Sequence, residues 1–176
     1  MGGELKLESE FGKGSKFSFE LSLPVVESAS DVTKNSNSIL QQYEHCMTET
    51  INILIVEDNA INQLIAKEML SKEGFKVTVV NNGQEAIDTV KNHVFDLVLM
   101  DIQMPVMDGK TATRYLKSDP EYKHIPIIAM TANVMTHEVD NYFKIGFSGF
   151  ISKPFVSDEI LKVVFEILSQ PSLVNH

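Results

Sequence analysis

The sequence has little cysteine and lacks long apolar or basic runs. Cys46 is the single cysteine among 176 residues, which excludes an internal disulfide framework and favours a reducing compartment. No window approaches the roughly 18 consecutive apolar residues of a membrane-spanning helix. No long run of lysine and arginine occurs and the formal net charge is -9, so we expect neither nucleic acid nor an anionic membrane as a partner.

A secretory leader is also absent from the start of the sequence. Residues 1–4 lack the basic and apolar regions of a signal peptide, so we expect a cytoplasmic location; a membrane anchor upstream in a longer parent protein is left open. The composition that is present, 43% hydrophobic and 22% charged, is typical of a globular protein. It suffices for one full core and a fragment of another.

Residues 1–24 have the pattern of a short β-hairpin. Apolar side chains alternate along residues 16–23, and Leu5 and Leu7 alternate in an earlier run. The glycine-rich connection between them is typical of a hairpin turn: Gly12-Lys13-Gly14. Two strands alone are marginally stable in water, so we expect this hairpin to be the end of something larger.

This hairpin resembles the C-terminal end of the ATP-binding domain of histidine kinases. The matching motifs are Met1-Gly2-Gly3, Glu8-Ser9-Glu10 and Gly12-Lys13-Gly14-Ser15-Lys16-Phe17. The last of these has the form of the final glycine box of that family. The family's asparagine-bearing box and its earlier glycine box are missing, so ATP binding is not implied and the chain lacks the complete kinase domain.

A change in composition separates this hairpin from the rest of the chain. Serine, asparagine and threonine dominate residues 28–38 without an apolar period, which is typical of a linker. We therefore divide the chain into a kinase remnant at residues 1–24, a linker at 25–50, a main domain at 51–170 and a tail at 171–176.

The main domain shows strands alternating with helices. We predict strands at residues 51–56, 76–80, 97–100, 127–130 and 149–152, with helices at about 60–74, 83–92, 109–118, 136–144 and 157–168. Because parallel strands need right-handed crossovers, these five units predict an α/β fold. We expect five parallel strands in the flavodoxin-like order 2-1-3-4-5, with helices on both faces.

Two of these helices have specific sequence signals. Asn59 is a plausible N-cap for the first, in which Ile61, Leu64, Ile65 and Met69 follow helical spacing. We predict that Ser157 caps the last helix. The apolar residues predicted for the inner face of that helix are Ile160, Val164, Ile167 and Leu168.

Polar side chains follow four of the five predicted strands. Glu57 and Asp58 follow the first, Asp101 the third, Thr131 the fourth and Lys153 the fifth. In this strand order the first and third strands are neighbours, so the three carboxylates should meet at one edge of the sheet. Three carboxylates repel one another unless a cation lies among them. Oxygen ligands without histidine or cysteine favour Mg²⁺.

This set of residues suits phosphoryl transfer. The carboxylate of Asp101 can attack phosphorus and form an acyl phosphate. Bound Mg²⁺ and the Lys153 ammonium would offset the charge of the incoming group. The Thr131 hydroxyl and backbone amides near Ala132 would hold its remaining oxygens.

Residues 51–170 resemble the receiver domain of two-component signalling, in the form attached to hybrid histidine kinases. The motifs that carry the resemblance are Val56-Glu57-Asp58-Asn59 with Asn62, Asn82-Gly83-Gln84-Glu85-Ala86, Met100-Asp101-Ile102-Gln103-Met104-Pro105-Val106-Met107-Asp108-Gly109, Met130-Thr131-Ala132-Asn133 and Phe150-Ile151-Ser152-Lys153-Pro154-Phe155. The resemblance implies that Asp101 is the phosphoacceptor. It also implies that Glu57, Asp58 and the backbone carbonyl of Gln103 join Asp101 in binding Mg²⁺.

The resemblance further implies a switch and a donor. Thr131 and Lys153 would contact the phosphoryl group, and Phe150 would turn inward as Thr131 moves toward Asp101. The donor would be a phosphohistidine, on a kinase dimerisation domain or a histidine-phosphotransfer protein, docking beside the first helix near Ile61. The domain would catalyse its own phosphorylation without a diffusible product, which leaves its status as an enzyme open.

Four other functions share part of this pattern of residues. A stand-alone response regulator has the same motifs, whereas a phosphorylation-independent interaction module predicts a degraded acidic pocket, and this one is complete. An aspartyl phosphatase of similar topology carries a second acid where Gln103 stands. A nucleotide or flavin binder needs a glycine-rich first turn, and the sequence there is Glu57-Asp58-Asn59-Ala60.

Overall fold

The structure is a computed structural model that describes residues 4–10, 14–20, 50–132 and 136–169. The chain divides into two units, Met1–Ser38 and Ile39–His176. In the first, β1 (Glu4–Glu10) pairs antiparallel with β2 (Gly14–Glu20), and Leu5 lies opposite Phe19. The predicted hairpin is present, although its second strand begins earlier than predicted. Gly12 and Lys13 of the predicted turn and residues 25–49 of the predicted linker lie outside the described residues, whereas Gly14 is the first residue of β2.

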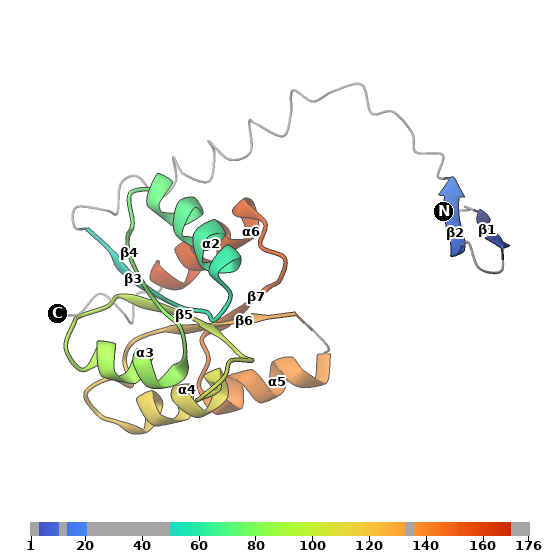
Figure 1. The fold of residues 1–176 in the computed structure, drawn as a ribbon. Coiled ribbons are helices and arrows are strands. Elements are labelled where there is room, and N and C mark those ends of the chain that lie inside the picture. Colours follow the sequence, from blue (N-terminus) through green and yellow to red (C-terminus); the bar gives the residue numbers. More distant parts are fainter. Residues whose placement is uncertain (1–3, 11–13, 21–49, 133–135, 170–176) are drawn as a thin grey trace. The chain divides into compact units, whose positions relative to one another are not determined.

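The second unit contains a five-stranded parallel sheet (Figure 1). Its strands are β3 (Asn52–Val56), β4 (Lys76–Val80), β5 (Leu97–Asp101), β6 (Ile127–Thr131) and β7 (Gly149–Ser152). Their spatial order is β4-β3-β5-β6-β7, which confirms the predicted order 2-1-3-4-5. The sheet therefore places the ends of β3, β5, β6 and β7 side by side at one edge.

Helices cover both faces of this sheet. Figure 1 shows α2 (Ala60–Lys72) and α6 (Ser157–Leu168) on one face, with α3 (Gly83–Val90), α4 (Gly109–Ser118) and α5 (Thr136–Ile145) on the other. The two covered faces explain the unbroken apolar runs of β5 and β6, in which every residue is buried. Within the described residues, no helix has both the length and the apolar character needed to cross a bilayer.

The helix N-termini confirm one predicted cap and correct another. Asn59 caps α2, because its side chain accepts hydrogen bonds from the backbone N–H groups of Ile61 and Asn62. The prediction that Ser157 caps α6 is wrong: the N-cap is Val156, which makes no side-chain capping bond, and Ser157 is the first helical residue. The first turn of α6 is instead acidic, which complements the positive end of the helix dipole.

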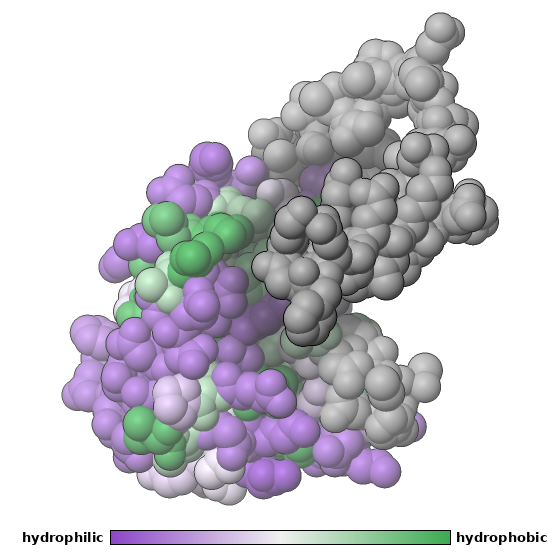
Figure 2. All heavy atoms as spheres, turned by 45° about the vertical axis from the view of Figure 1, so that its right-hand side comes forward, coloured by the Kyte–Doolittle hydropathy of each residue, from purple (hydrophilic) through white to green (hydrophobic). Residues whose placement is uncertain are grey.

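The apolar residues of α2 are divided between core and solvent. Ile61 and Leu64 are 69% and 60% exposed, and Ile65 is 39% exposed, whereas Ala66 and Leu70 are buried. We call the exposed group Ile61, Leu64 and Ile65 the α2 patch. Figure 2 shows apolar atoms at the surface in the region of α2, surrounded by hydrophilic ones. The periodicity predicted the helix correctly, but much of its apolar surface lies outside the core.

Candidate functional site

Three carboxylates meet at the carboxyl edge of the sheet. One oxygen from each of Glu57, Asp58 and Asp101 lies within 4.8 Å of the others. Their proximity follows from the pairing of β3 with β5, in which Val56 lies opposite Met100. Glu57 and Asp101 are buried, whereas Asp58 is exposed. The cluster is thus open to solvent on one side.

Lys153 bridges the two buried carboxylates. Its Nζ atom lies 2.6 Å from Glu57 Oε2 and 2.7 Å from Asp101 Oδ2. The backbone N–H of Lys153 donates to the carbonyl of Thr131 over 2.8 Å, which fixes the end of β7 beside the end of β6. A buried charge needs such partners to offset its lost hydration. The ammonium group therefore compensates for two desolvated carboxylates at once.

Burial raises the pKa of Asp101 above its usual value. Among the partners of Asp101, the Lys153 ammonium lowers this pKa most strongly. The backbone N–H of Gln103, which donates to Asp101 Oδ1 over 3.1 Å, lowers it next. The nearby Glu57 charge adds to the upward shift. The ionised form of Asp101 is poorly solvated, so it depends on neighbouring cations and donors.

Residues at the start of α2 orient Glu57. Asn62 Nδ2 donates to Glu57 Oε1 over 3.0 Å, and Gln63 Nε2 donates to the Glu57 carbonyl over 2.6 Å. Glu57 Oε2 is buried, and its partner within the described residues is the Lys153 ammonium. This atom and its two carboxylate neighbours form an oxygen-only donor set. Such a set fits a hard divalent cation such as Mg²⁺.

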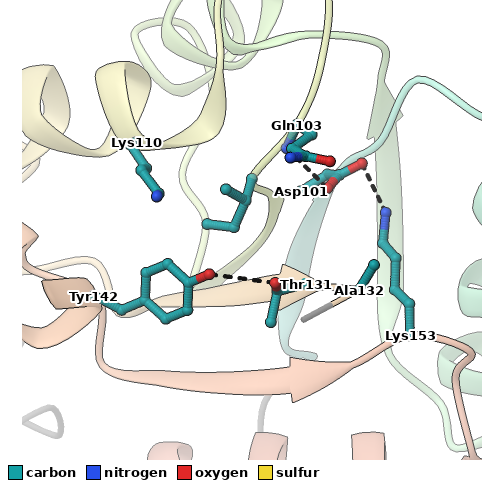
Figure 3. Close-up of a pocket in the computed structure, with 8 residues that line it drawn as sticks. Asp101, Gln103, Lys110, Thr131, Ala132, Tyr142 and Lys153 are labelled. Carbon is teal, nitrogen blue, oxygen red and sulfur yellow. Dashed lines mark hydrogen bonds and ion pairs between the residues drawn. The ribbon is translucent and has the colours of Figure 1, made fainter. Parts of the chain in front are cut away.

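A cavity of about 200 Å³ lies beside Asp101 (Figure 3). Its lining consists of Asp101, Ile102, Gln103, Lys110, Thr131, Ala132, Tyr142 and Lys153. These residues come from the ends of β5, β6 and β7 and from the helices α4 and α5. The cavity is polar and adjoins a carboxylate, so it can take a small charged group directly on Asp101.

The loop after β5 packs closely against Asp101. Gly109 lies at the start of α4, where its N–H donates to the Ile102 carbonyl over 3.2 Å. A Cβ atom at this position would overlap the carbonyl oxygen of Asp101. The absence of a side chain at residue 109 therefore lets α4 begin directly behind the site.

The structure brings together most of the side chains predicted for the site. Asp101, Lys153 and Thr131 line the cavity, and Glu57 and Asp58 cluster with Asp101 without being lining residues. Gln103 lines the cavity and its backbone N–H binds Asp101. Phe150 is half-buried on β7 against the apolar cluster that contains Tyr142, and it is not among the lining residues. Asn133 lies outside the described residues.

A scan of protein families matches the response regulator receiver domain to residues 53–165. This chain belongs to that family. The matched range includes β4 to β7 in full, all of β3 except Asn52, and α6 as far as Phe165.

Individual relatives of this receiver domain come from several kinds of protein. It is 35% identical over 113 residues to the polar-differentiation response regulator DivK of Brucella anthropi, covering 64% of this chain and 92% of DivK. The whole chain is 32% identical to Histidine kinase 5 of Arabidopsis thaliana over an alignment of 187 residues, which covers 92% of this chain and 20% of the kinase. The chain thus spans about a fifth of that larger relative.

A solved structure resembles the receiver domain in both fold and sequence. The receiver domain of the sensor histidine kinase PA1611 from Pseudomonas aeruginosa superposes with a TM-score of 0.64 at 33% identity. The match covers 69% of this chain and all of the other. That crystal structure is described as having a magnesium ion coordinated in the active site cleft.

Sequence reasoning missed three residues of the receiver domain that shape the site. Tyr142 and Lys110 line the cavity from α5 and α4, and Gln63 holds the backbone of Glu57. Lys110 and Gln63 directly follow the motif residues Gly109 and Asn62, but no pattern gave either of them a role, and Tyr142 stands inside a helix away from any motif. Only their position in the folded domain reveals their contact with the site.

Proposed function

We propose that this chain is the phosphoacceptor receiver domain of a hybrid histidine kinase in a phosphorelay. The observation that supports it best is the Lys153 ammonium, which bridges Asp101 and Glu57 beside an open polar cavity. A purely structural ion pair needs no such cavity. Here the same carboxylate that pairs with Lys153 is also accessible to a small anionic group.

In the proposed reaction, an oxygen of Asp101 attacks the phosphorus of a phosphohistidine. The new P–O bond forms as the P–N bond breaks, and the imidazole nitrogen leaves with the electron pair. Mg²⁺ held by Glu57, Asp58, Asp101 and the backbone carbonyl of Gln103 would offset the charge on the phosphoryl oxygens. Lys153 would stabilise the same charge, since its ammonium already lies 2.7 Å from Asp101 Oδ2.

Phosphorylation then changes the surface of the domain through Thr131. The Thr131 hydroxyl moves toward the new dianion and donates a hydrogen bond to one of its oxygens. Backbone amides near Ala132 hold the remaining oxygens. Phe150 turns into the space that Thr131 leaves, which changes the surface around α5 and β7.

The proposed donor is a phosphohistidine on a kinase dimerisation domain or a histidine-phosphotransfer protein. The α2 patch lies on the helix that starts beside Glu57, and its exposed apolar side chains suit an apolar helix face of a partner. We further propose that residues 1–24 are the end of a kinase ATP-binding domain, that 25–50 link it to the receiver domain at 51–170, and that 171–176 form a tail. The single cysteine supports a cytoplasmic location.

The test is phosphoryl uptake from acetyl phosphate in Mg²⁺, measured as a mass increase of the intact chain. We expect the wild type to gain one phosphoryl group and Asp101→Asn to gain none while its circular dichroism is unchanged. Asp88→Asn, an exposed change of the same kind on α3, should gain as much as the wild type. Stoichiometric uptake by Asp101→Asn would refute the site. A folded wild type that takes up no phosphoryl group would favour a phosphorylation-independent interaction module.

A further inference from the structure

Tyr142 makes a buried contact that the proposed reaction does not use. Its hydroxyl lies 3.3 Å from Thr131 Oγ1, within hydrogen-bond distance. Tyr142 is 2% exposed and Thr131 is 5% exposed, so bulk water has little access to either hydroxyl. Figure 3 shows the tyrosine reaching Thr131 from α5, on the opposite side of the cavity from Lys153.

Two further contacts hold the tyrosine ring in place. The ring of Phe147 packs edge-on against it, with the centroids 5.8 Å apart and an interplanar angle of 73°. On α4, Lys110 Nζ lies 5.3 Å from the centroid of the same ring, in cation–π contact. The hydroxyl of Tyr142 is therefore presented to Thr131 by a side chain that has little freedom to move.

We infer that Tyr142 is a positioning residue that restrains Thr131 in the unphosphorylated state and so opposes switching. This inference rests on the proposed function, in which Thr131 moves toward a phosphoryl group on Asp101. That movement separates Thr131 from Tyr142 and leaves a buried phenol without its partner, which is unfavourable. The phosphoryl group must supply enough differential interaction to overcome this restraint.

Lys110 connects the restraint to the charge in the cavity. Its side chain lines the cavity and also contacts the ring of Tyr142. An incoming dianion attracts the ammonium of Lys110, which weakens the contact that holds the tyrosine. The restraint is thus strongest in the empty site and weakest in the phosphorylated one.

The experiment is a titration with beryllium fluoride in excess Mg²⁺, which mimics a phosphoryl group on a carboxylate. It is followed by the NMR amide signals of Thr131 and Phe150. We expect Tyr142→Phe to lower the midpoint of the titration about fivefold, the usual effect of one buried hydrogen bond. Tyr115→Phe removes an exposed phenol from α4 and should leave the midpoint unchanged.

A second pair of variants separates restraint of Thr131 from a general packing effect. In a Thr131→Val background, where residue 131 has no hydroxyl, Tyr142→Phe should have no effect on the midpoint. An equal effect in both backgrounds would overturn the inference, as would an unchanged or higher midpoint for Tyr142→Phe alone. A wild type that does not bind beryllium fluoride would instead refute the proposed function.

Discussion

Replacing Lys153 by methionine removes the one cation that lies between Glu57 and Asp101 within the described part of the receiver domain. The two buried carboxylates then face each other without compensation, because both oxygens lie within 2.7 Å of the lost ammonium. Removing one partner of a buried ion pair typically destabilises a protein by about 3 kcal/mol or more. For a domain of this size that loss corresponds to a fall in melting temperature of about 10 °C.

The loss should depend on pH, because Asp101 can bind a proton in place of the missing cation. Burial already raises the pKa of Asp101, and Lys153 opposes that rise, so the substitution raises it further. A carboxyl group whose pKa is higher in the folded than in the unfolded state loses stability as pH increases through the folded-state pKa. Lys153→Met should therefore be more destabilising at pH 8 than at pH 5.

The assay is urea unfolding followed by circular dichroism, in EDTA and again in excess Mg²⁺. Bound Mg²⁺ should restore part of the stability of Lys153→Met, since ligand binding at about 100 times its dissociation constant adds about 2.7 kcal/mol. Lys162→Met is the matched control. Lys162 lies 3.9 Å from Glu166 in an exposed pair, so its loss should change the free energy of unfolding by less than about 0.5 kcal/mol. Equal effects of the two substitutions, or no dependence on pH, would refute this account of the site.

Three further predictions concern stability and docking. Asp108→Ala removes the N-cap of α4, whose carboxylate accepts from the Thr111 N–H over 2.8 Å; we expect a loss of about 1 kcal/mol in urea unfolding at pH 7. That bond lowers the pKa of Asp108, so this contribution should be present above the unfolded-state pKa and disappear as pH falls through the folded-state pKa. Gly109→Ala places a methyl group against the Asp101 carbonyl and should destabilise the domain by about 2 kcal/mol in the same assay. Leu64→Asp, in the α2 patch, should slow phosphoryl transfer from a phosphohistidine protein about tenfold but leave the rate of uptake from acetyl phosphate unchanged. If the substitution changed both rates by the same factor, or neither of them, docking at α2 would be contradicted.

The fold could be predicted closely because its signals are local. Buried strands carry continuous apolar runs such as Leu97–Met100, and Asn59 caps a helix through bonds to Ile61 and Asn62, only two and three residues away. The cap predicted at Ser157 was wrong because a serine before a helix does not determine where the backbone first becomes helical. The capping position fell one residue earlier, at Val156.

The exposure of α2 shows a different limit of sequence patterns. Ile61, Leu64 and Ile65 are apolar at helical spacing, yet they are exposed, while Ala66 and Leu70 reach the core. Spacing defines which residues share a helix face. Which face meets the sheet depends on how the whole helix is docked, and that is decided by contacts with distant segments.

The sequence by itself determined the alternation of strands and helices and the acidic residues at the strand ends, because apolar runs and turn signals act over short stretches of chain. Only the tertiary structure decided which atoms meet there. It placed the Lys153 ammonium between Glu57 and Asp101, and it brought the hydroxyl of Tyr142 to Thr131. Such contacts depend on side-chain directions across neighbouring elements, which no local pattern encodes.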